Sequence, residues 1–489
     1  MVDAGRFPQI YLPLIGVGVA ALWPLTAYAL NPLLLPTALL LGAIVLAVLR
    51  RPEYGLAVAV AITPLTGLEI DQQIGANFTL PREPFKFLLP LIVFGVLVYG
   101  ALLQGPDRRK LPGVSVGITL LIGAALVSSV QGLEPSEAVA DVFLLLTASA
   151  LFVAILNICR TRDQLLVVVA GALCALLIAS VHGVVQHFEG VFSTQGFVAG
   201  GESVGRVQGS FGHPNEYAGF VALLLPLAVA VAATKELPSQ LRLLAGAAAL
   251  AAVPALNYSY ARAAIASLVL GALIWLLIMR PKLAVIAAVV VAVGAVALAP
   301  GVLKERFNPE SAEDDVALRS DVAQSALDIY GEDPLLGVGV NNFQTAYSER
   351  FAAETAGQRR LLHNEQLLVP TASPSQYLNT LAEQGLVGIG ALAIFLLLAL
   401  GSAWRVSKAR DPAVRGLGLG IGIAVLAVVL YSLAEISLQE VQVVILFTLL
   451  GIATTAESAF RWPRTESEQS GEFVIGPRRP RGRALSTAP

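Results

Sequence analysis

The run LLVVVAGALCALLIASV, residues 165–181, contains no charged side chain. A lipid bilayer core is spanned by about 20 mainly apolar residues in helical form. With its neighbours, this run forms an apolar stretch over residues 164–187, which is long enough to cross a membrane. The stretch therefore predicts a transmembrane helix, and similar stretches occur on both sides of it.

The overall composition agrees with a membrane protein. Of the 489 residues, 56% are hydrophobic and only 13% are charged, whereas soluble domains carry about 25% charged residues. The first apolar run follows Arg6, and a second follows it almost at once, so we interpret the first as a retained anchor. We predict a multi-pass membrane domain over residues 8–457 and a disordered cytoplasmic tail over 458–489, which is rich in Pro, Arg, Ser and Glu.

The fold class that follows is an all-α polytopic membrane protein with about fourteen helices, in a range of 12–14, and one large extracytoplasmic loop. The predicted spans are residues 9–29, 32–49, 54–70, 84–104, 112–130, 138–159, 164–187, 217–234, 241–256, 262–279, 283–300, 379–403, 416–436 and 439–457. The third span is short and is interrupted by Pro64.

The basic residues predict the orientation of these spans, because Lys and Arg accumulate in cytoplasmic loops. With fourteen spans, 22 of the 32 basic residues lie on one side of the membrane. We therefore expect both termini to be cytoplasmic and the long connection 301–378 to lie outside, together with a second, Gly- and Ser-rich loop over 188–216.

Candidate site residues collect on the predicted outer side. Arg206, His213 and Asn215 lie in the run GRVQGSFGHPNEYAG, residues 205–219, whose glycines permit close approach of the backbone to a ligand. Pro214 suits the first position of a helix, and a helix N-terminus attracts anions. The alternative interpretation of this run is a capped turn.

Arg262 opens a long apolar span in the run NYSYAR, residues 257–262. An arginine near membrane depth needs an anionic partner or an interfacial position. It is therefore either an anion-binding residue that faces a water-filled cavity or an interfacial residue. Arg319 lies in the long outer connection.

Acidic and amide side chains mark other predicted outer helix ends. Glu137 and Asp141 are four residues apart at the start of one span, and Gln186 lies at the end of another. Glu383 lies inside the helix that follows the long loop, where we expect it to face protein or water. Solvated helix ends explain the first three almost as well as a site does. We count Gln186, with Arg206, His213 and Asn215, as a candidate substrate-binding residue.

The chain contains no Walker loop, no dinucleotide-binding fingerprint, no HExxH motif and no carboxylate cluster suited to a metal. We therefore expect no cofactor, no metal site and no nucleic-acid partner.

Taken in order, these segments resemble the O-antigen ligase and polymerase superfamily, which contains the lipopolysaccharide O-antigen ligases and the Wzy-type polymerases. The similarity covers residues 200–400, whereas the first half matches only in hydropathy. It is carried by residues 206–219, the Tyr260–Ala263 region, Arg319, DPLLGVGVNNF at 333–343 and YLNTLAEQGLVG at 377–388.

The resemblance implies a glycosyltransferase that works at the outer face of the bacterial cytoplasmic membrane, without a metal, in surface polysaccharide biosynthesis. Its donor would be a glycan on undecaprenyl pyrophosphate, and its acceptor a hydroxyl group of a second glycan or lipid. By position, Arg262 and Arg319 are similar to the two arginines that hold the leaving pyrophosphate in this family. Membrane lipids and other polysaccharide-assembly proteins are the further partners that it implies.

The chain departs from the family pattern at the expected catalytic histidine. Family members usually read His-Asn-x-Tyr-Leu where this chain has PSQYL, with Pro374 at the histidine position. Proline has no side-chain group that accepts a proton. His363 lies eleven residues earlier and is a candidate to reach the same cavity; Glu383 and the pair at the start of span 138–159 are alternative bases.

Two other functions remain open at this stage. A transporter or anion carrier would have polar or broken helices near the bilayer midplane, whereas few charges interrupt these spans. A non-catalytic component of a polysaccharide-assembly system would account for the missing histidine.

Overall fold

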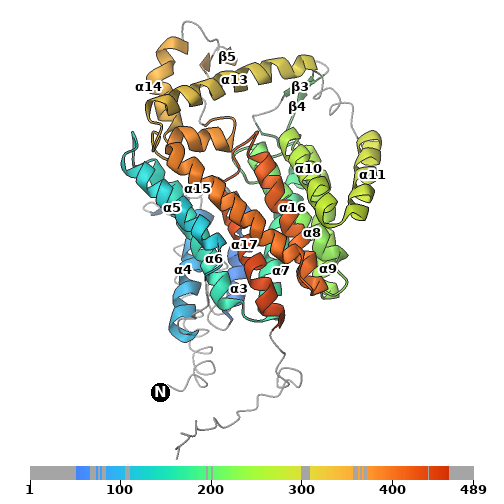
Figure 1. Ribbon diagram of the computed structural model, residues 1–489. Helices are drawn as coiled ribbons and strands as arrows, with labels where there is room; N and C mark the ends of the chain where they lie inside the picture. The colour runs from blue at the N-terminus through green and yellow to red at the C-terminus, as the bar shows by residue number, and fades with distance from the viewer. Residues whose placement is uncertain are drawn as a thin grey trace, which may run out of the picture.

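The computed structural model of the protein describes residues 51–65, 73–74, 78–79, 84–104, 111–193, 197–199, 202–298, 309–355, 362–363, 366–367, 372–438 and 440–461. Among these residues it is mainly helical (Figure 1). The predicted spans 9–29 and 32–49 lie outside the described residues, as does the predicted tail from residue 462 onward.

The helices are α3 (Pro52–Ala61), the 3-10 helix η1 (Thr63–Leu65), α4 (Pro84–Gln104), α5 (Val114–Val130), α6 (Ala138–Ile158), α7 (Arg162–Glu189), α8 (Pro214–Ala233), α9 (Ser239–Tyr258), α10 (Arg262–Met279), α11 (Pro281–Leu298), α13 (Pro309–Glu332), α14 (Phe343–Thr355), α15 (Gln376–Ser407), α16 (Pro412–Tyr431) and α17 (Glu440–Arg461). The strands form three antiparallel pairs, β1 (Gln73–Ile74) with β2 (Phe78–Thr79), β3 (Phe197–Ala199) with β4 (Glu202–Val204), and β5 (Leu362–His363) with β6 (Gln366–Leu367).

Eight of the described helices are long and apolar enough to cross a membrane: α6, α7, α8, α9, α10, α15, α16 and α17 from Val441. Helix α5, with 17 residues, is shorter. The predicted span 54–70 is helical over Pro52–Ala61 and then turns into η1, and residues 66–70 lie outside the described residues. Ten helical residues rise about 15 Å, half of a bilayer core, so the count of fourteen spans stays a prediction.

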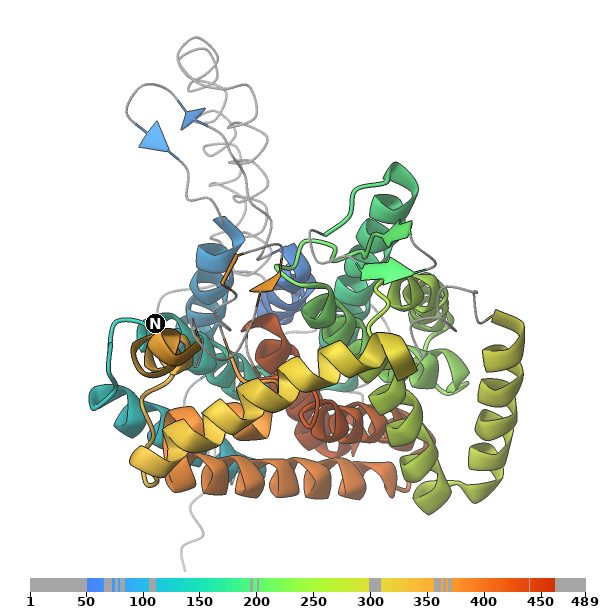
Figure 2. The same cartoon turned by 90° about the horizontal axis from the view of Figure 1, so that it is seen from above.

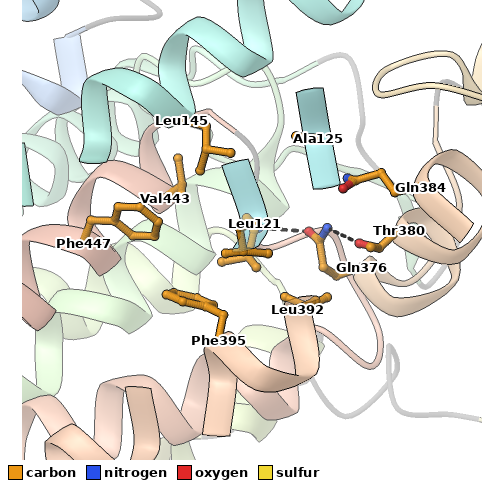
Figure 3. Close-up of a pocket in the computed structure, with 11 residues that line it drawn as sticks. Leu121, Ala125, Leu145, Gln376, Thr380, Gln384, Leu392, Phe395, Val443 and Phe447 are labelled. Atoms are coloured by element: carbon orange, nitrogen blue, oxygen red, sulfur yellow. Dashed lines mark hydrogen bonds between the residues drawn. The ribbon is translucent and has the colours of Figure 1, made fainter. Parts of the chain in front are cut away.

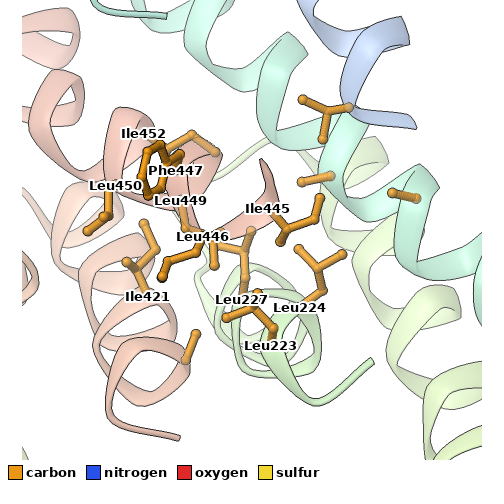
Figure 4. Packing of buried hydrophobic residues seen from close by; sticks show 14 of the residues in the cluster. Leu223, Leu224, Leu227, Ile421, Ile445, Leu446, Phe447, Leu449, Leu450 and Ile452 are labelled. Carbon is orange, nitrogen blue, oxygen red and sulfur yellow. The ribbon is translucent and has the colours of Figure 1, made fainter. Parts of the chain in front are cut away.

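The centre of the bundle is α17, of whose apolar window 78% is buried, whereas only 22% of the window of α10 is buried. Helix α17 contacts α6, α7, α8, α15 and α16. Figure 4 shows its leucines and Phe447 packed against Leu223, Leu224 and Leu227 of α8 and Ile421 of α16. Helices with one exposed face surround this core, as expected where lipid rather than protein covers the outside.

Local signals determine where the central helices begin. The Thr161 side chain accepts a hydrogen bond from the N–H of Gln164, and the Gln164 side chain accepts one from the N–H of Thr161. This reciprocal pair is a capping box at the start of α7. Asp411 accepts from the N–H groups of Ala413 and Val414 at the start of α16, which has Pro412 in its first turn.

The predicted outer loop 301–378 contains two helices, α13 and α14. Helix α13 lies across one end of the bundle in both ribbon views (Figures 1 and 2), and we name this the α13 end. Val322, Ala326 and Ile329 of α13 recur at helical spacing and pack with Phe343 and Ala382. Helices α13 and α14 of this connection are thus folded onto α15 through a small hydrophobic core.

Candidate functional site

The segment that leads into α8 is held against the ends of α7 and α9. The Val207 N–H donates to the Tyr258 carbonyl over 3.2 Å. Gln186 Oε1 accepts from the Gly209 N–H at 2.8 Å, and Gln186 Nε2 donates to the Gly209 carbonyl at 2.7 Å. Gly209 has a φ of 61°, a conformation that favours glycine. Gln186, which we predicted to bind substrate, therefore holds the loop that carries Arg206.

Four polar side chains from separate segments form one hydrogen-bonded chain at the α13 end, which we name the arginine network: Arg206, Asn215, Glu435 and Arg319. Arg206 donates from Nε to the Ser259 carbonyl at 2.8 Å and from Nη2 to Asn215 Oδ1 at 2.5 Å. Asn215 Nδ2 donates to Glu435 Oε1 at 2.9 Å, and Arg319 Nη2 donates to the same oxygen at 2.6 Å. One amide and one carboxylate thus connect the two arginines.

The two arginines of the network differ in exposure. Arg206 is 5% exposed, and a buried guanidinium is stable only with its hydrogen-bonding groups satisfied. The side chain of Arg319 is 46% exposed, and that of Glu435 is 17% exposed. The guanidinium of Arg319 is therefore accessible from outside the protein, whereas Arg206 is buried and is connected to Glu435 through Asn215.

Arg319 also attaches α13 to the bundle. Its Nη1 donates to the Ala434 carbonyl at 2.6 Å, beside the ion pair with Glu435. Bonds from one guanidinium to a carbonyl and to a carboxylate fix the orientation of its plane. The ion pair joins α13 to the short turn between α16 and α17.

The first turn of α8 is anchored to both neighbouring helices. Tyr431 of α16 donates its hydroxyl to the Asn215 carbonyl at 2.8 Å, and Gln442 Nε2 of α17 donates to the Glu216 carbonyl at 2.9 Å. These bonds set the position of the Asn215 side chain within the network.

His213 is the residue before α8, and its Nδ1 accepts from the Asn215 N–H at 3.0 Å. Burial, together with the nearby charges of Arg206 and Arg319, lowers the pKa of His213 to about 4. The imidazole is therefore neutral near pH 7, as its role as an acceptor at a helix N-terminus requires.

Arg262, which we predicted to bind an anion, is half-buried and is the first residue of α10. It follows by three residues Ser259, whose carbonyl accepts from Arg206. The backbone of Arg262 therefore lies beside the arginine network, although the hydrogen-bonded chain itself joins Arg206 to Arg319.

The two sequence blocks 333–343 and 377–388 bind each other through their backbones. Four hydrogen bonds join them, from the N–H of Val338 to Ala382 O, of Gly339 to Glu383 O, of Leu386 to Pro334 O and of Val387 to Leu335 O. The helix of the second block is broken at Gly385, with φ 60° and ψ −155°, which leaves N–H and C=O groups available to the first block. The two blocks therefore form one structural joint.

Glu383 lies inside this joint and is buried. Its carboxylate accepts from the N–H of Phe343 at the start of α14 at 3.3 Å, and its carbonyl accepts from Ser128 Oγ at 2.6 Å. A carboxylate at the N-terminus of a helix stabilises it. Glu383 thus connects α14 to α15, and it also lines a cavity.

This cavity lies among α5, α6, α15 and α17 (Figure 3). It consists of two adjoining spaces of about 80 Å³ each, which share Ala125, Leu145, Gln376, Gln384, Leu438 and Val443. Asp141 lines one of the two spaces together with Glu383. The structure therefore brings together two of the carboxylates that we considered as bases.

The remaining predicted residues lie elsewhere. The backbone of His363 belongs to β5, and its side chain lies outside the described residues. Pro374 precedes Ser375, whose hydroxyl donates to the Ser432 carbonyl at 3.0 Å. Glu137 contributes its carbonyl to a bond from Asn341 Nδ2 at 3.3 Å. Among the residues that the structure describes, no group of three His, Cys, Asp or Glu side chains is placed to hold a metal ion.

Sequence reasoning missed Glu435, the residue on which Arg319 and Asn215 converge. The signal was available, because Glu435 lies at the junction of two apolar spans, where an acidic side chain is costly without a partner. The partner itself lies 116 residues away, beyond any local pattern.

Residues 246–393 match the family model described as O-antigen ligase, whereas no curated protein matches the chain. The matched segment contains Arg262, Arg319 and both blocks of the joint, and it ends before Glu435. Together with the eight apolar helices, the match makes this a multi-pass membrane protein. The chain therefore carries a domain of the O-antigen ligase family, as its resemblance to the O-antigen ligase and Wzy-type polymerase superfamily predicted.

Proposed function

We propose that the protein transfers or polymerises an undecaprenyl-pyrophosphate-linked glycan onto an acceptor hydroxyl at the outer face of the bacterial cytoplasmic membrane. The family match supports a role in surface polysaccharide synthesis. The observation that carries the finer proposal is the arginine network, which gathers two arginines from distant segments at one end of the bundle.

In this proposal the arginines stabilise the leaving group. The acceptor oxygen bonds to the anomeric carbon of the donor sugar, the bond from that carbon to pyrophosphate breaks, and negative charge develops on the departing phosphate. Arg319, which is half-exposed, and Arg262 at the start of α10 neutralise that charge, without a metal. Arg206 and Glu435 hold the geometry of the site, with Asn215 between them.

A base must take the proton of the acceptor hydroxyl. Asp141 and Glu383 are the carboxylates that line the cavity; Glu383 is buried, whereas Asp141 is partly exposed and is therefore more accessible to an acceptor. Asp141 is therefore the first candidate to test, and His363 the second.

Purified protein in lipid nanodiscs, incubated with undecaprenyl-pyrophosphate glycan, tests this function. We expect longer chains, or glycan transferred to an added acceptor, and we expect Arg262→Ala and Arg319→Ala each to abolish the product while the protein still accumulates in the membrane. Undiminished polymer in both variants contradicts the proposal. Uptake of a solute by protein in liposomes, without glycan transfer, supports the transporter alternative instead.

A further inference from the structure

Two tryptophans meet near the C-terminal ends of α10 and α15. Both helices begin at the α13 end, α10 beside the arginine network and α15 at Gln376, whose N–H donates to the Glu435 carbonyl at 3.2 Å. Trp275 of α10 and Trp404 of α15 pack edge to face, with ring centroids 6.0 Å apart and an angle of 88° between their planes. Helix α16 contacts both helices, and an added Cβ at its Gly422 would meet the Trp275 indole. Glycine at this position therefore makes room for Trp275 beside Trp404, and the two helix ends lie side by side (Figure 2).

Basic side chains gather where these helices end. Two belong to the junction of α10 with α11 and four to the junction of α15 with α16, and we name them together the basic corner: Arg280, Lys282, Arg405, Lys408, Arg410 and Arg415. The acidic side chain in these segments is Asp411, which caps α16 by accepting from two backbone N–H groups. Among the residues that the structure describes, no ion pair involves any of the six. Repulsion among these like charges therefore favours an anionic ligand.

Lys408 is held at the basic corner by the indole of Trp404. Its Nζ lies 4.1 Å from the centroid of the Trp404 ring, within the range of a cation–π contact. The Trp404 ring in turn packs against Trp275, which is buried. Lys408 itself is exposed, so its N–H donors remain available to an oxygen ligand. One cation is thus in position before a ligand binds, which lowers the entropic cost of binding.

An apolar, exposed surface leads to the basic corner. Leu270, Ile274 and Leu277 of α10 are exposed and recur at helical spacing on one face. Arg280 follows Leu277 by three residues. In a membrane such a face contacts acyl chains rather than protein. Basic groups at the end of a lipid-facing stripe match a phospholipid, whose phosphate lies at the boundary of the hydrocarbon core.

We propose that the basic corner binds a phospholipid with two phosphate groups, of the diphosphatidylglycerol type, in the leaflet that the basic residues predict to be cytoplasmic. Arg280 and Lys282 neutralise one phosphate. Lys408 and Arg410 neutralise the other, and the acyl chains lie along the exposed face of α10. Basic surfaces between membrane helices on the cytoplasmic side bind head groups of this kind. The inference concerns the end of the bundle remote from the arginine network and does not rest on the proposed function.

Native mass spectrometry of the full-length protein in detergent measures this binding without requiring transfer. The probes are tetraoleoyl cardiolipin, dioleoyl phosphatidylglycerol and dioleoyl phosphatidylcholine, each titrated separately. We expect one cardiolipin to bind at least about tenfold more tightly than phosphatidylglycerol, a difference of ~1.4 kcal/mol, and phosphatidylcholine to bind more weakly still. Similar affinities for cardiolipin and phosphatidylglycerol overturn the assignment of a two-phosphate lipid.

Two lysine substitutions provide a matched pair. Lys408 and Lys235 are both exposed, but Lys235 lies in the connection between α8 and α9, outside the basic corner. We expect Lys408→Ala to weaken cardiolipin binding about fivefold, because one cation near a phosphate is lost, and Lys235→Ala to leave it unchanged. Trp404→Leu keeps the ammonium but removes the ring beneath it, and should weaken binding about twofold to fivefold.

Arg280→Ala tests the other junction. Combined with Lys408→Ala, it should leave cardiolipin bound no more tightly than phosphatidylglycerol. Equal losses in Lys408→Ala and Lys235→Ala would show that only the net charge of this end attracts the lipid, which overturns the basic corner as a site. A preference for cardiolipin that survives in the double variant overturns it as well.

Discussion

Glu435 links two arginines from different parts of the chain, Arg319 directly and Arg206 through Asn215. It accepts from Arg319 at 2.6 Å and from Asn215 at 2.9 Å on the same oxygen, and Asn215 in turn accepts from Arg206. Charge-assisted bonds of this kind are about twice as strong as neutral ones. In the proposed reaction, the carboxylate therefore positions Arg319 and does not itself contact the reacting atoms.

Glu435→Ala should lower glycan transfer by about tenfold to a hundredfold, because removing an acceptor of charged hydrogen bonds costs about 1.5–3 kcal/mol. Glu435→Gln retains an acceptor oxygen and should lose less. Initial rates with undecaprenyl-pyrophosphate glycan measure both variants. The control is Glu457→Ala, because the Glu457 carboxylate pairs with Arg461 at the exposed end of α17. The rate of this variant should match that of the wild type. Equal rates for all three variants would contradict the role of Glu435.

His213 makes the folded protein sensitive to acid. Its pKa is lowered from 6.5 to about 4, so between these values the unfolded chain binds a proton that the folded protein does not. Stability is therefore full above pH 6.5 and is lost as the pH falls toward 4. The unfolding temperature should fall between pH 7 and pH 5 by more in wild type than in His213→Asn, which keeps a capping acceptor; equal decreases contradict this explanation.

At the scale of elements, the joint between residues 333–343 and 377–388 depends on the backbone of Gly385. This residue has φ 60°, and an added Cβ would meet the carbonyl group of Leu335 and the nitrogen of Leu336. The break in α15 is therefore possible only for glycine at this position.

Gly385→Ala should destabilise the protein by about 1–3 kcal/mol or prevent its accumulation, since both the dihedral angles and the space are unsuitable. Gly390→Ala, five residues later on the same helix, meets no atom within 4 Å and should be neutral or slightly stabilising. Thermal unfolding of the two purified variants measures the difference. Similar stability of both variants would show that the joint does not require the break.

Local patterns in the sequence did not reveal helix α13. We predicted an outer loop over 301–378, because the region lacks a long apolar run, but Val322, Ala326 and Ile329 form a helical stripe that packs on Phe343 and Ala382. A stripe of three apolar residues is too narrow to distinguish a docked helix from a loop until its partner is known.

At the scale of the whole molecule, the structure places two sets of connections at opposite ends of the bundle. The connection between α8 and α9 lies at the end opposite to α13 (Figure 1). The basic residues predict that the end with the α8–α9 connection is cytoplasmic. The orientation in a membrane stays a prediction, and cysteine labelling tests it.

After replacement of Cys159 and Cys174, single cysteines are introduced as Glu236→Cys and Glu332→Cys, both at exposed positions. A membrane-impermeant maleimide added to intact spheroplasts should label the cysteine at 332, at the end of α13, and not the one at 236 between α8 and α9. Permeabilised cells should label both. The reverse pattern would invert the topology and place the arginine network in the cytoplasm.

The positions of most described helices could be read from the amino-acid sequence. Helix α4, predicted over 84–104, is Pro84–Gln104, and α10, predicted over 262–279, is Arg262–Met279. An apolar run bounded by proline or charge has one low-energy state in lipid, in which its backbone groups bond within the segment. This information is local and can be read from the chain.

The assembly of the site, in contrast, depends on how the helices pack. The partner of Arg319 is Glu435, 116 residues away, and the neighbour of Glu383 at the cavity is Asp141 on α6. Contacts between helix ends depend on how α8, α13, α15 and α17 pack, and packing is set by the summed shape of many side chains rather than by any run of residues. For that reason the arginines were identifiable in the sequence, whereas the pairing of Arg319 with Glu435 was not.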